Sequence, residues 1–266
     1  MKYPGYKRSS ENMKLYARQQ GQGADVISLH GLFGSGENLG MINRGLAESF
    51  RVHGLDLRNH GRSPHDEAMN YPVMAEDVLA YMDDNQLEKV HLLGHSMGGK
   101  VAMTIALMAP ERVTRLAVID IAPVTYQERR HDSILEGLSS MPLNTLKSRT
   151  EADRFLEAYE PEQGVRQFLL KNLYRDEQGL YRWRVNLPVI MAHYMEILAG
   201  QESDTGFANK TLFIKGGESD YILPEHREQV LALFPSASMR VIPGAGHWVH
   251  AQKPELVTRT LLRFFG

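Results

Sequence analysis

A serine between two glycines is the first group in this sequence with the setting of a nucleophile. Ser96 lies in Gly94-His95-Ser96-Met97-Gly98, the only G-x-S-x-G pattern of the chain. The strand-like run Lys89 to Gly94 precedes the serine, and the helix-compatible run Val101 to Met108 follows it. A serine held in a strained strand-to-helix turn needs small residues on both sides. The pattern therefore predicts that Ser96 is a nucleophile presented at the end of a strand.

A serine nucleophile requires a general base, and His247 is the best placed of the eleven histidines. It ends the loop Pro243-Gly244-Ala245-Gly246-His247, which follows a strand-like run. Small residues in this loop let the imidazole approach another loop closely, as a base between serine and carboxylate must. We therefore predict that His247 takes the proton of Ser96.

Two acids compete to orient His247. Asp120 lies at the end of the strand-like run at 115–121, and Asp220 follows the run at 210–215. Both fit the chain order of serine, acid and histidine that is known for strand-to-helix serine turns. The residues alone leave both acids open.

A His-Gly turn upstream is suited to stabilising negative charge. Ile27 to Ser35 runs from a strand into His30-Gly31-Leu32-Phe33. The backbone N–H groups of Leu32 and Met97 are predicted to form an oxyanion hole, in which one donor is typically worth ~10²- to 10³-fold in rate. Because these donors belong to the main chain, the side chains of Leu32, Met97 and Phe33 are expected to shape the substrate pocket. His30 and His95 are expected to hold their turns by hydrogen bonds.

Metal chemistry is not expected. His250 lies three residues after His247, but no H-E-x-x-H or other ligand spacing accompanies the pair. The chain has no cysteine, which excludes disulfides, thiolate nucleophiles and cysteine-based zinc or iron–sulfur sites.

Short apolar runs alternate with helical stretches and must position these groups. Such alternation predicts an α/β fold, with a mostly parallel central sheet flanked by helices on both faces. Ligand sites in open sheets of this kind gather at the carboxyl ends of the strands. The predicted strands are Ala24 to Leu29, Arg51 to Leu57, Lys89 to Gly94, Arg115 to Ile121, Lys210 to Lys215 and Met239 to Ile242.

The alternation stops for more than eighty residues in the second half of the chain. We predict a core domain of residues 1–122 and 210–266, and a helical cap insertion of residues 123–209 over the strand ends. Four basic side chains of this insertion are expected to face solvent, since long cationic side chains usually do; any that face the entrance would steer anionic substrates such as CoA thioesters. They are Arg129, Arg130, Arg182 and Arg184. Predicted helices of the insertion are Arg129 to Leu138, Thr150 to Tyr159, Val165 to Asn172 and Leu187 to Leu198.

Bulk composition favours small-molecule chemistry. The 266 residues carry 30 Lys+Arg and 32 Asp+Glu, a formal net charge of -2, which gives no field to attract nucleic acid or an anionic membrane. Met1 to Glu11 lacks the apolar stretch of a signal peptide, and no window approaches a membrane span. We predict a cytoplasmic protein, a monomer or small homo-oligomer, with a small-molecule substrate and neither nucleic-acid nor membrane partners.

Taken together, these motifs resemble the YbfF-type bacterial esterases of the α/β-hydrolase fold. The resemblance covers nearly the whole chain and rests on His30 to Ser35, Asp56 to Pro64, Gly94 to Lys100, Ile119 to Pro123 and Gly244 to His250. It implies a helical cap, no cofactor, and hydrolysis of short to medium acyl esters or acyl-CoA thioesters.

The same resemblance implies Asp120 as the acid of the triad, although α/β-hydrolases in general draw the acid from the later loop that carries Asp220. Carbon–carbon bond hydrolases and perhydrolases share the serine triad, so they stay open as alternatives. The third alternative is an α/β-hydrolase that binds a ligand in its pocket with little turnover. A serine at position 96 argues against epoxide hydrolases and haloalkane dehalogenases, which carry an aspartate at the corresponding position of the strand-to-helix turn.

Overall fold

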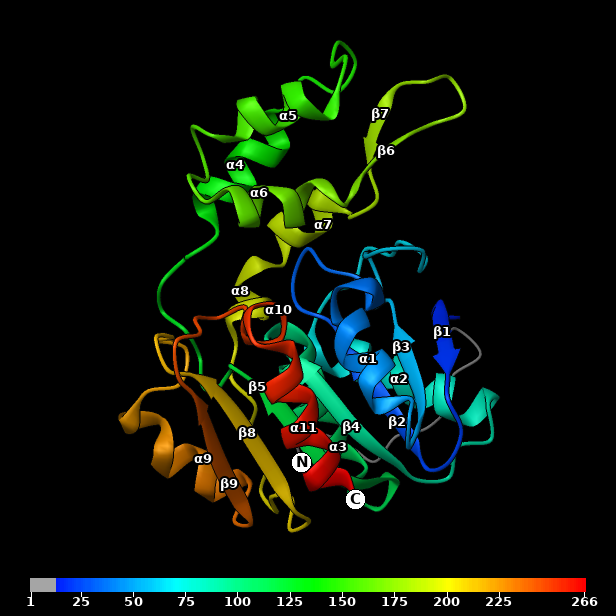
Figure 1. Ribbon diagram of the computed structural model, residues 1–266, viewed down its shortest axis with the longest axis vertical. Helices are drawn as coiled ribbons and strands as arrows, with labels where there is room; N and C mark the ends of the chain where they lie inside the picture. The colour runs from blue at the N-terminus through cyan, green and yellow to red at the C-terminus, as the bar shows by residue number, and fades with distance from the viewer. Residues whose placement is uncertain (1–12) are drawn as a thin grey trace.

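The computed structural model describes residues 13–266 as a twisted sheet between helices, with a cap above one end of the sheet (Figure 1). The segment Met1 to Glu11, in which no signal peptide was predicted, lies outside the described residues. The strand order is β1-β3-β2-β4-β5-β8-β9. The strands are β1 Ala17–Gln20, β2 Asp25–Leu29, β3 Arg51–Leu55, β4 Val90–His95, β5 Val113–Ile119, β8 Thr211–Gly216 and β9 Ala237–Ile242.

The six predicted strands all pair in parallel, and the predicted α/β class is confirmed. β4 is buried along its whole length, as expected for a strand covered by helices on both faces. The sequence analysis missed β1, which pairs with β3 in the antiparallel direction at the edge of the sheet. Its sequence Ala-Arg-Gln-Gln has no apolar run, because an edge strand needs little burial.

Helices cover both faces of the sheet. On one face, α1 and α11 pack side chains such as Ile42 and Leu261 against Val26 and Ile214 of the strands. On the other, α2, α3 and α9 pack against the alternate strand residues, such as Ile27 and Leu92. The helices of the core are α1 Gly40–Leu46, α2 Tyr71–Asp84, α3 Met97–Met108, α9 Arg227–Leu233, α10 Val249–Gln252 and α11 Pro254–Phe265. Short 3-10 turns are η1 Gly36–Leu39, η2 Pro110–Arg112 and η3 Pro224–His226.

The cap emerges after β5 and returns to the sheet at β8 (Figure 1). Its elements are α4 Asp132–Ser140, α5 Arg149–Leu156, α6 Gln163–Leu170, β6 Leu173–Arg175, β7 Tyr181–Trp183, α7 Leu187–Ala192 and α8 Tyr194–Leu198. The insertion is therefore not purely helical, because β6 and β7 form an antiparallel hairpin. The Asp176 carboxylate accepts the N–H groups of Gln178 and Leu180, and Gly179 takes a left-handed φ of 80°, which together close the turn.

The boundaries 1–122, 123–209 and 210–266 stay a prediction. Within residues 13–266, no helix combines the length and apolarity needed to cross a bilayer.

Candidate active site

Ser96 occupies a strained turn between β4 and α3. Its φ of 52° and ψ of -121° are unusual for a residue with a side chain. A Cβ on Gly94 would lie 2.2 Å from the carbonyl oxygen of Gly98, and one on Gly98 would lie 2.3 Å from that of Leu29. Both glycines are therefore required by close backbone approach. The turn is also tied to the neighbouring strand, since the Ser96 N–H donates to the Ile119 carbonyl at 3.0 Å.

A chain of hydrogen bonds connects Ser96 to a buried carboxylate. Ser96 Oγ lies 3.0 Å from His247 Nε2, and His247 Nδ1 lies 2.8 Å from Asp120 Oδ2. Because an ionised carboxylate only accepts hydrogen bonds, Nδ1 carries the proton and Nε2 is free to accept the serine hydroxyl. This is the tautomer that a general base requires.

Asp120 is held in place from several sides. Its side chain is fully buried, and its own φ of 53° turns the carboxyl away from the direction of β5. The Asp120 N–H donates to the Ile214 carbonyl at 2.8 Å, and Oδ1 accepts the Gly216 N–H at 2.8 Å. The Ser219 hydroxyl donates to Oδ2, the same oxygen that accepts the His247 N–H. These donors supply hydrogen-bond partners to both oxygens of the buried side chain.

The side chain of Asp220 contacts Arg130 and not His247. Its side chain is 67% exposed and forms an ion pair with Arg130. The hydrogen bond from Arg130 lowers the pKa of the Asp220 carboxyl below its usual value. Ser219, one residue earlier, faces Asp120 instead. The structure therefore brings Asp120, and not Asp220, to His247.

The His-Gly turn lies directly against the serine. A Cβ on Gly31 would lie 3.0 Å from His95 Nδ1 and 3.3 Å from the Cβ of Ser96, so glycine avoids two tight contacts at this approach. Leu32 and Met97 line a pocket together with Ser96. Met97 is the first residue of α3, so its N–H has no acceptor within the helix. No backbone acceptor is found for the Leu32 N–H in residues 13–266. Both N–H groups are thus available near Ser96, while their role as an oxyanion hole stays a prediction.

Two buried histidines hold this turn in shape. His30 Nδ1 lies 2.8 Å from the Gly31 carbonyl and Nε2 accepts the Leu57 N–H at 3.0 Å. His60 Nε2 accepts the Phe33 N–H at 3.2 Å. Burial lowers the pKa of His30 to about 4 and that of His60 to about 3, so both rings are neutral and their acceptor nitrogens stay available.

His250 forms no metal pair with His247. The His250 ring is buried against His95 at a centroid distance of 4.1 Å, whereas both ring nitrogens of His247 already have partners. His95 Nε2 donates to the His247 carbonyl at 2.9 Å and so positions the histidine loop. Residues 13–266 contain no group of three or more His, Cys, Asp or Glu arranged to hold a metal ion.

Three residues of the site were missed from the sequence. Ser219 contacts the acid, and the Tyr221 ring stacks on the His247 ring at 3.8 Å. Lys100 lies in α3, where its buried ammonium donates to the carbonyls of Val124, Leu198 and Ala199, so it joins both ends of the cap to the core. Burial lowers the pKa of Lys100 to about 7. A lysine inside an otherwise apolar helix was the signal that could have been noticed.

Two small pockets flank Ser96, each with a volume of about 30 Å³. One extends under Tyr126 and Leu198, and the other lies between Phe33 of the core and Phe168 of the cap. Arg130 lines the first pocket, so the prediction that the basic residues of the cap face solvent is wrong for Arg130. Arg129 is exposed and paired with Asp132, as that prediction required.

Comparison with known proteins agrees with this geometry. Residues 26–254 match the alpha/beta hydrolase fold family. Esterase YbfF of Escherichia coli is 41% identical over 93% of this chain and 95% of its own length. The sn-1-specific diacylglycerol lipase ABHD11 of Xenopus laevis is 41% identical over 87% of this chain and 76% of its own.

A solved structure gives the same answer. A marine microorganism esterase superposes with a TM-score of 0.93 and 39% identity, covering 95% of this chain and 99% of its own. The resemblance inferred from the motifs is confirmed. The chain belongs to the α/β-hydrolase fold family and, within it, to the YbfF-type esterases.

Proposed function

We propose that this protein hydrolyses carboxylic esters and thioesters of short acyl groups through a covalent acyl-enzyme on Ser96. The observation that carries the proposal is the continuous hydrogen-bonded chain from Ser96 through His247 to Asp120. The family supplies the class of reaction, and the substrate and the residue roles are the proposed part.

The reaction proceeds in two steps. His247 Nε2 takes the hydroxyl proton as Ser96 Oγ attacks the acyl carbon, and Asp120 stabilises the resulting imidazolium. The N–H groups of Leu32 and Met97 stabilise the oxyanion. His247 then gives its proton to the departing alcohol or thiol, which leaves the acyl group on Ser96. In the second step His247 takes a proton from water as the water oxygen attacks the acyl carbon. The bond between Ser96 Oγ and the acyl carbon then breaks, His247 gives the proton to Ser96 Oγ, and the carboxylic acid is released.

Short acyl groups fit the space beside Ser96. A water molecule needs a cavity of roughly 10–15 Å³, so a pocket of about 30 Å³ admits only a few heavy atoms without movement of the cap. Thioesters follow the same route because the serine attacks the same acyl carbon. The proposal includes no cofactor, a small-molecule substrate and a cytoplasmic location.

Kinetics of a p-nitrophenyl ester series test this proposal. Turnover is expected to be highest for acetyl to butyryl esters and to fall with longer chains; a maximum at long chains would contradict the proposed acyl length.

Ser96→Ala should remove essentially all turnover, whereas the control Ser139→Ala alters only an exposed serine of α4. Activity of Ser96→Ala within tenfold of wild type would exclude Ser96 as nucleophile. Chelator-sensitive turnover would exclude a cofactor-free reaction.

A further inference from the structure

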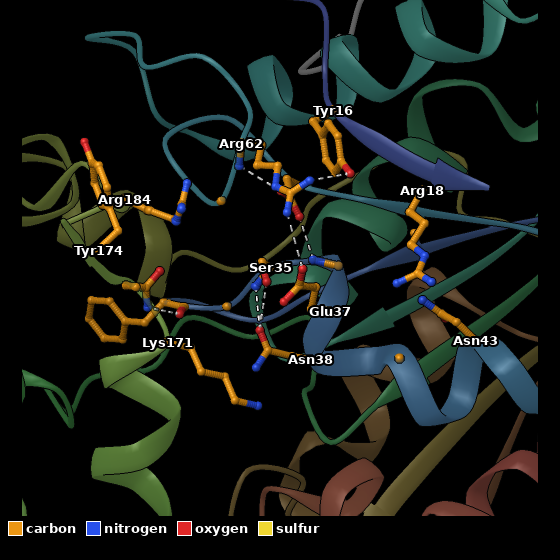
Figure 2. A pocket seen from close by; sticks show the side chains of 18 of the residues that line it. Tyr16, Arg18, Ser35, Glu37, Asn38, Asn43, Arg62, Lys171, Tyr174 and Arg184 are labelled. Carbon is orange, nitrogen blue, oxygen red and sulfur yellow. Dashed lines mark hydrogen bonds and ion pairs between the residues drawn. The ribbon is translucent and has the colours of Figure 1, made fainter. Parts of the chain in front are cut away.

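A cavity of about 510 Å³ lies between the cap and the core. Arg62 of the core and Lys171 and Arg184 of the cap line it (Figure 2). The buried Phe33 stands between this cavity and the pocket at Ser96. The cavity therefore adds no space for an acyl group bound at Ser96, and the limit on acyl length must lie in the two small pockets.

The pocket that extends under Leu198 is the one suited to the acyl group. Leu32 and Met97, whose N–H groups form the proposed oxyanion hole, both line this pocket. His247, which gives its proton to the leaving group, lines only the other pocket. The leaving group therefore belongs on the side of His247, and we call the pocket under Leu198 the acyl pocket.

Lys100 lines the acyl pocket and joins the two segments that connect the cap to the core. Residues 120–131 lead from β5 into the cap, and residues 198–210 lead back to β8. The Lys100 side chain is buried, and its Nζ donates to the carbonyl of Val124 at 2.8 Å. It also donates to the carbonyls of Leu198 and Ala199 at 3.1 and 2.5 Å. Three acceptors require three N–H groups, so this arrangement needs the ammonium form. We call these three hydrogen bonds the lysine clamp.

The two segments also pair with each other beside the lysine clamp. The Tyr126 N–H donates to the Leu198 carbonyl at 3.0 Å, and the Gln201 N–H donates to the Pro123 carbonyl at 3.2 Å. Because both segments meet at Leu198, an acyl chain that extends past this residue has to move them apart. Such a movement breaks bonds of the lysine clamp.

No carboxylate within residues 13–266 lies within ion-pair distance of Lys100, and burial lowers the pKa of its amine to about 7. Its ammonium lies over the rings of Tyr71 at 5.7 Å and Tyr126 at 4.7 Å, and burial raises the pKa of both phenols, so they stay neutral. The pKa of His226 is lowered by burial first and also by the charge of Lys100. The other titratable groups of the acyl pocket are Glu128, Arg130, His131 and Tyr221. A neutral amine would have only two N–H groups for the three carbonyls.

We propose that Lys100 is a positioning residue that limits the length of the acyl group, because its ammonium holds the two segments of the cap together at the acyl pocket. The inference rests on the proposed function for the acyl substrate but not for the lysine clamp itself. Loss of the proton leaves one carbonyl without its donor, weakens the connection and lets longer acyl groups enter. Selectivity for acyl length is therefore expected to depend on pH.

Lys100→Met tests the lysine clamp, since it keeps an unbranched side chain but removes the N–H groups. The ratio of kcat/KM for p-nitrophenyl octanoate to that for p-nitrophenyl butyrate should rise roughly tenfold above wild type, because entry of the longer chain no longer breaks hydrogen bonds to a charged group. Lys147→Met is the matched control, because Lys147 is an exposed lysine of the cap outside both pockets. A rise no larger than that of the control would overturn the proposal.

The pH dependence of wild type tests the same proposal without a variant. Between about pH 6 and about pH 9, the octanoate-to-butyrate ratio should rise roughly tenfold in wild type, whereas in Lys100→Met it should stay high and constant. The ratio cancels the titration of His247, since both esters use the same base. A constant ratio in wild type would overturn the proposal, even where Lys100→Met fails to fold.

Hydrogen exchange of Ser96→Ala examines the lysine clamp without turnover. The protection of the Tyr126 and Gln201 amides, relative to their intrinsic exchange rates, should fall roughly tenfold when Lys100→Met is added. Unchanged protection would overturn the proposal, whether or not Ser96 is the nucleophile. A loss of protection together with no ester turnover in wild type would support the lysine clamp and refute the proposed function.

Discussion

Asp120 and Asp220 follow neighbouring parallel strands, β5 and β8, yet only one of them contacts the histidine. Asp120 is fully buried and accepts hydrogen bonds from three groups, whereas Asp220 is exposed and paired with Arg130. The left-handed φ of 53° at Asp120 directs its carboxyl toward His247. In the later loop, the residue that faces the acid is Ser219. The comparison teaches that one backbone angle and a one-residue offset decide which acid reaches the base.

The largest expected effect is that of Asp120→Asn. The amide oxygen can keep the Gly216 N–H bond, while the amide N–H₂ group then faces His247 Nδ1. That arrangement favours the tautomer with its proton on Nε2, which cannot accept the serine proton. We expect kcat on p-nitrophenyl butyrate to fall by ~10⁴-fold.

An unchanged melting temperature should accompany this loss, since the amide replaces the carboxylate without a change in shape. A decrease of less than tenfold in kcat would show that Asp120 is not the acid that supports His247.

The sequence was sufficient to single out Ser96 and His247 because the small residues of their turns lie next to them in the sequence. Gly94 and Gly98 are required by contacts with backbone atoms. In the loop of His247, a Cβ on Gly246 would meet no atom closer than 3.8 Å, so the expected close approach is not what requires glycine there, whereas the φ of 65° at Gly244 favours it. Five of the six parallel strands were predictable because each is largely a buried apolar run, whereas β9 was predicted from its apolar residues although most of it is exposed. Local composition predicts a feature when the structural requirement is itself local.

Features that depend on distant segments could not be predicted. The direction of the Asp120 carboxyl depends on partners at Ile214, Gly216 and Ser219, nearly a hundred residues away. The edge strand β1 and the β6–β7 hairpin carry no apolar run long enough to predict them. Arg18 and Arg184 line the same cavity only because the cap folds back over the core, which the sequence did not reveal, although Arg184 is exposed to solvent as expected.

The second prediction concerns a carboxylate that is moved from position 120 to position 219. Because Ser219 Oγ already contacts Asp120 Oδ2, an aspartate at 219 places its carboxylate near His247 Nδ1. Asp120→Asn combined with Ser219→Asp should recover roughly tenfold of the kcat lost by Asp120→Asn alone. The control is Asp120→Asn with Asp220→Glu, which lengthens the outward-pointing acid and should recover nothing. Equal recovery in both double variants would mean that general charge, and not position, restores the base.

A smaller effect is expected for Ser219→Ala. This change removes one of the donors to Asp120 but leaves the His247 and Gly216 bonds in place. It also removes the acceptor of the Tyr221 N–H, and Tyr221 stacks on the imidazole. We expect kcat to fall by about three- to tenfold, in keeping with the ~0.5–1.5 kcal/mol net contribution of one ordinary hydrogen bond. Steady-state kinetics would measure it, and a loss as large as that of Asp120→Asn would assign Ser219 a more direct part.

The smallest effect is expected for Asp220→Asn, which removes only the partner of Arg130. Exposed ion pairs contribute little to stability, and this acid does not contact His247, so kcat should stay within about twofold of wild type. Arg130 lines a pocket at Ser96, so any change should appear in KM.

The pKa of Asp220 is lowered by its hydrogen bond to Arg130. The stability that the pair contributes is therefore present above pH 3.8 and is lost as the pH falls through the lowered pKa. Melting curves of wild type and Asp220→Asn should therefore differ slightly at pH 7 and converge below pH 3.8. A large loss of kcat with an unchanged melting curve would instead show that Asp220 supports His247 during turnover, and the contrast between the two acids would then belong only to the resting enzyme.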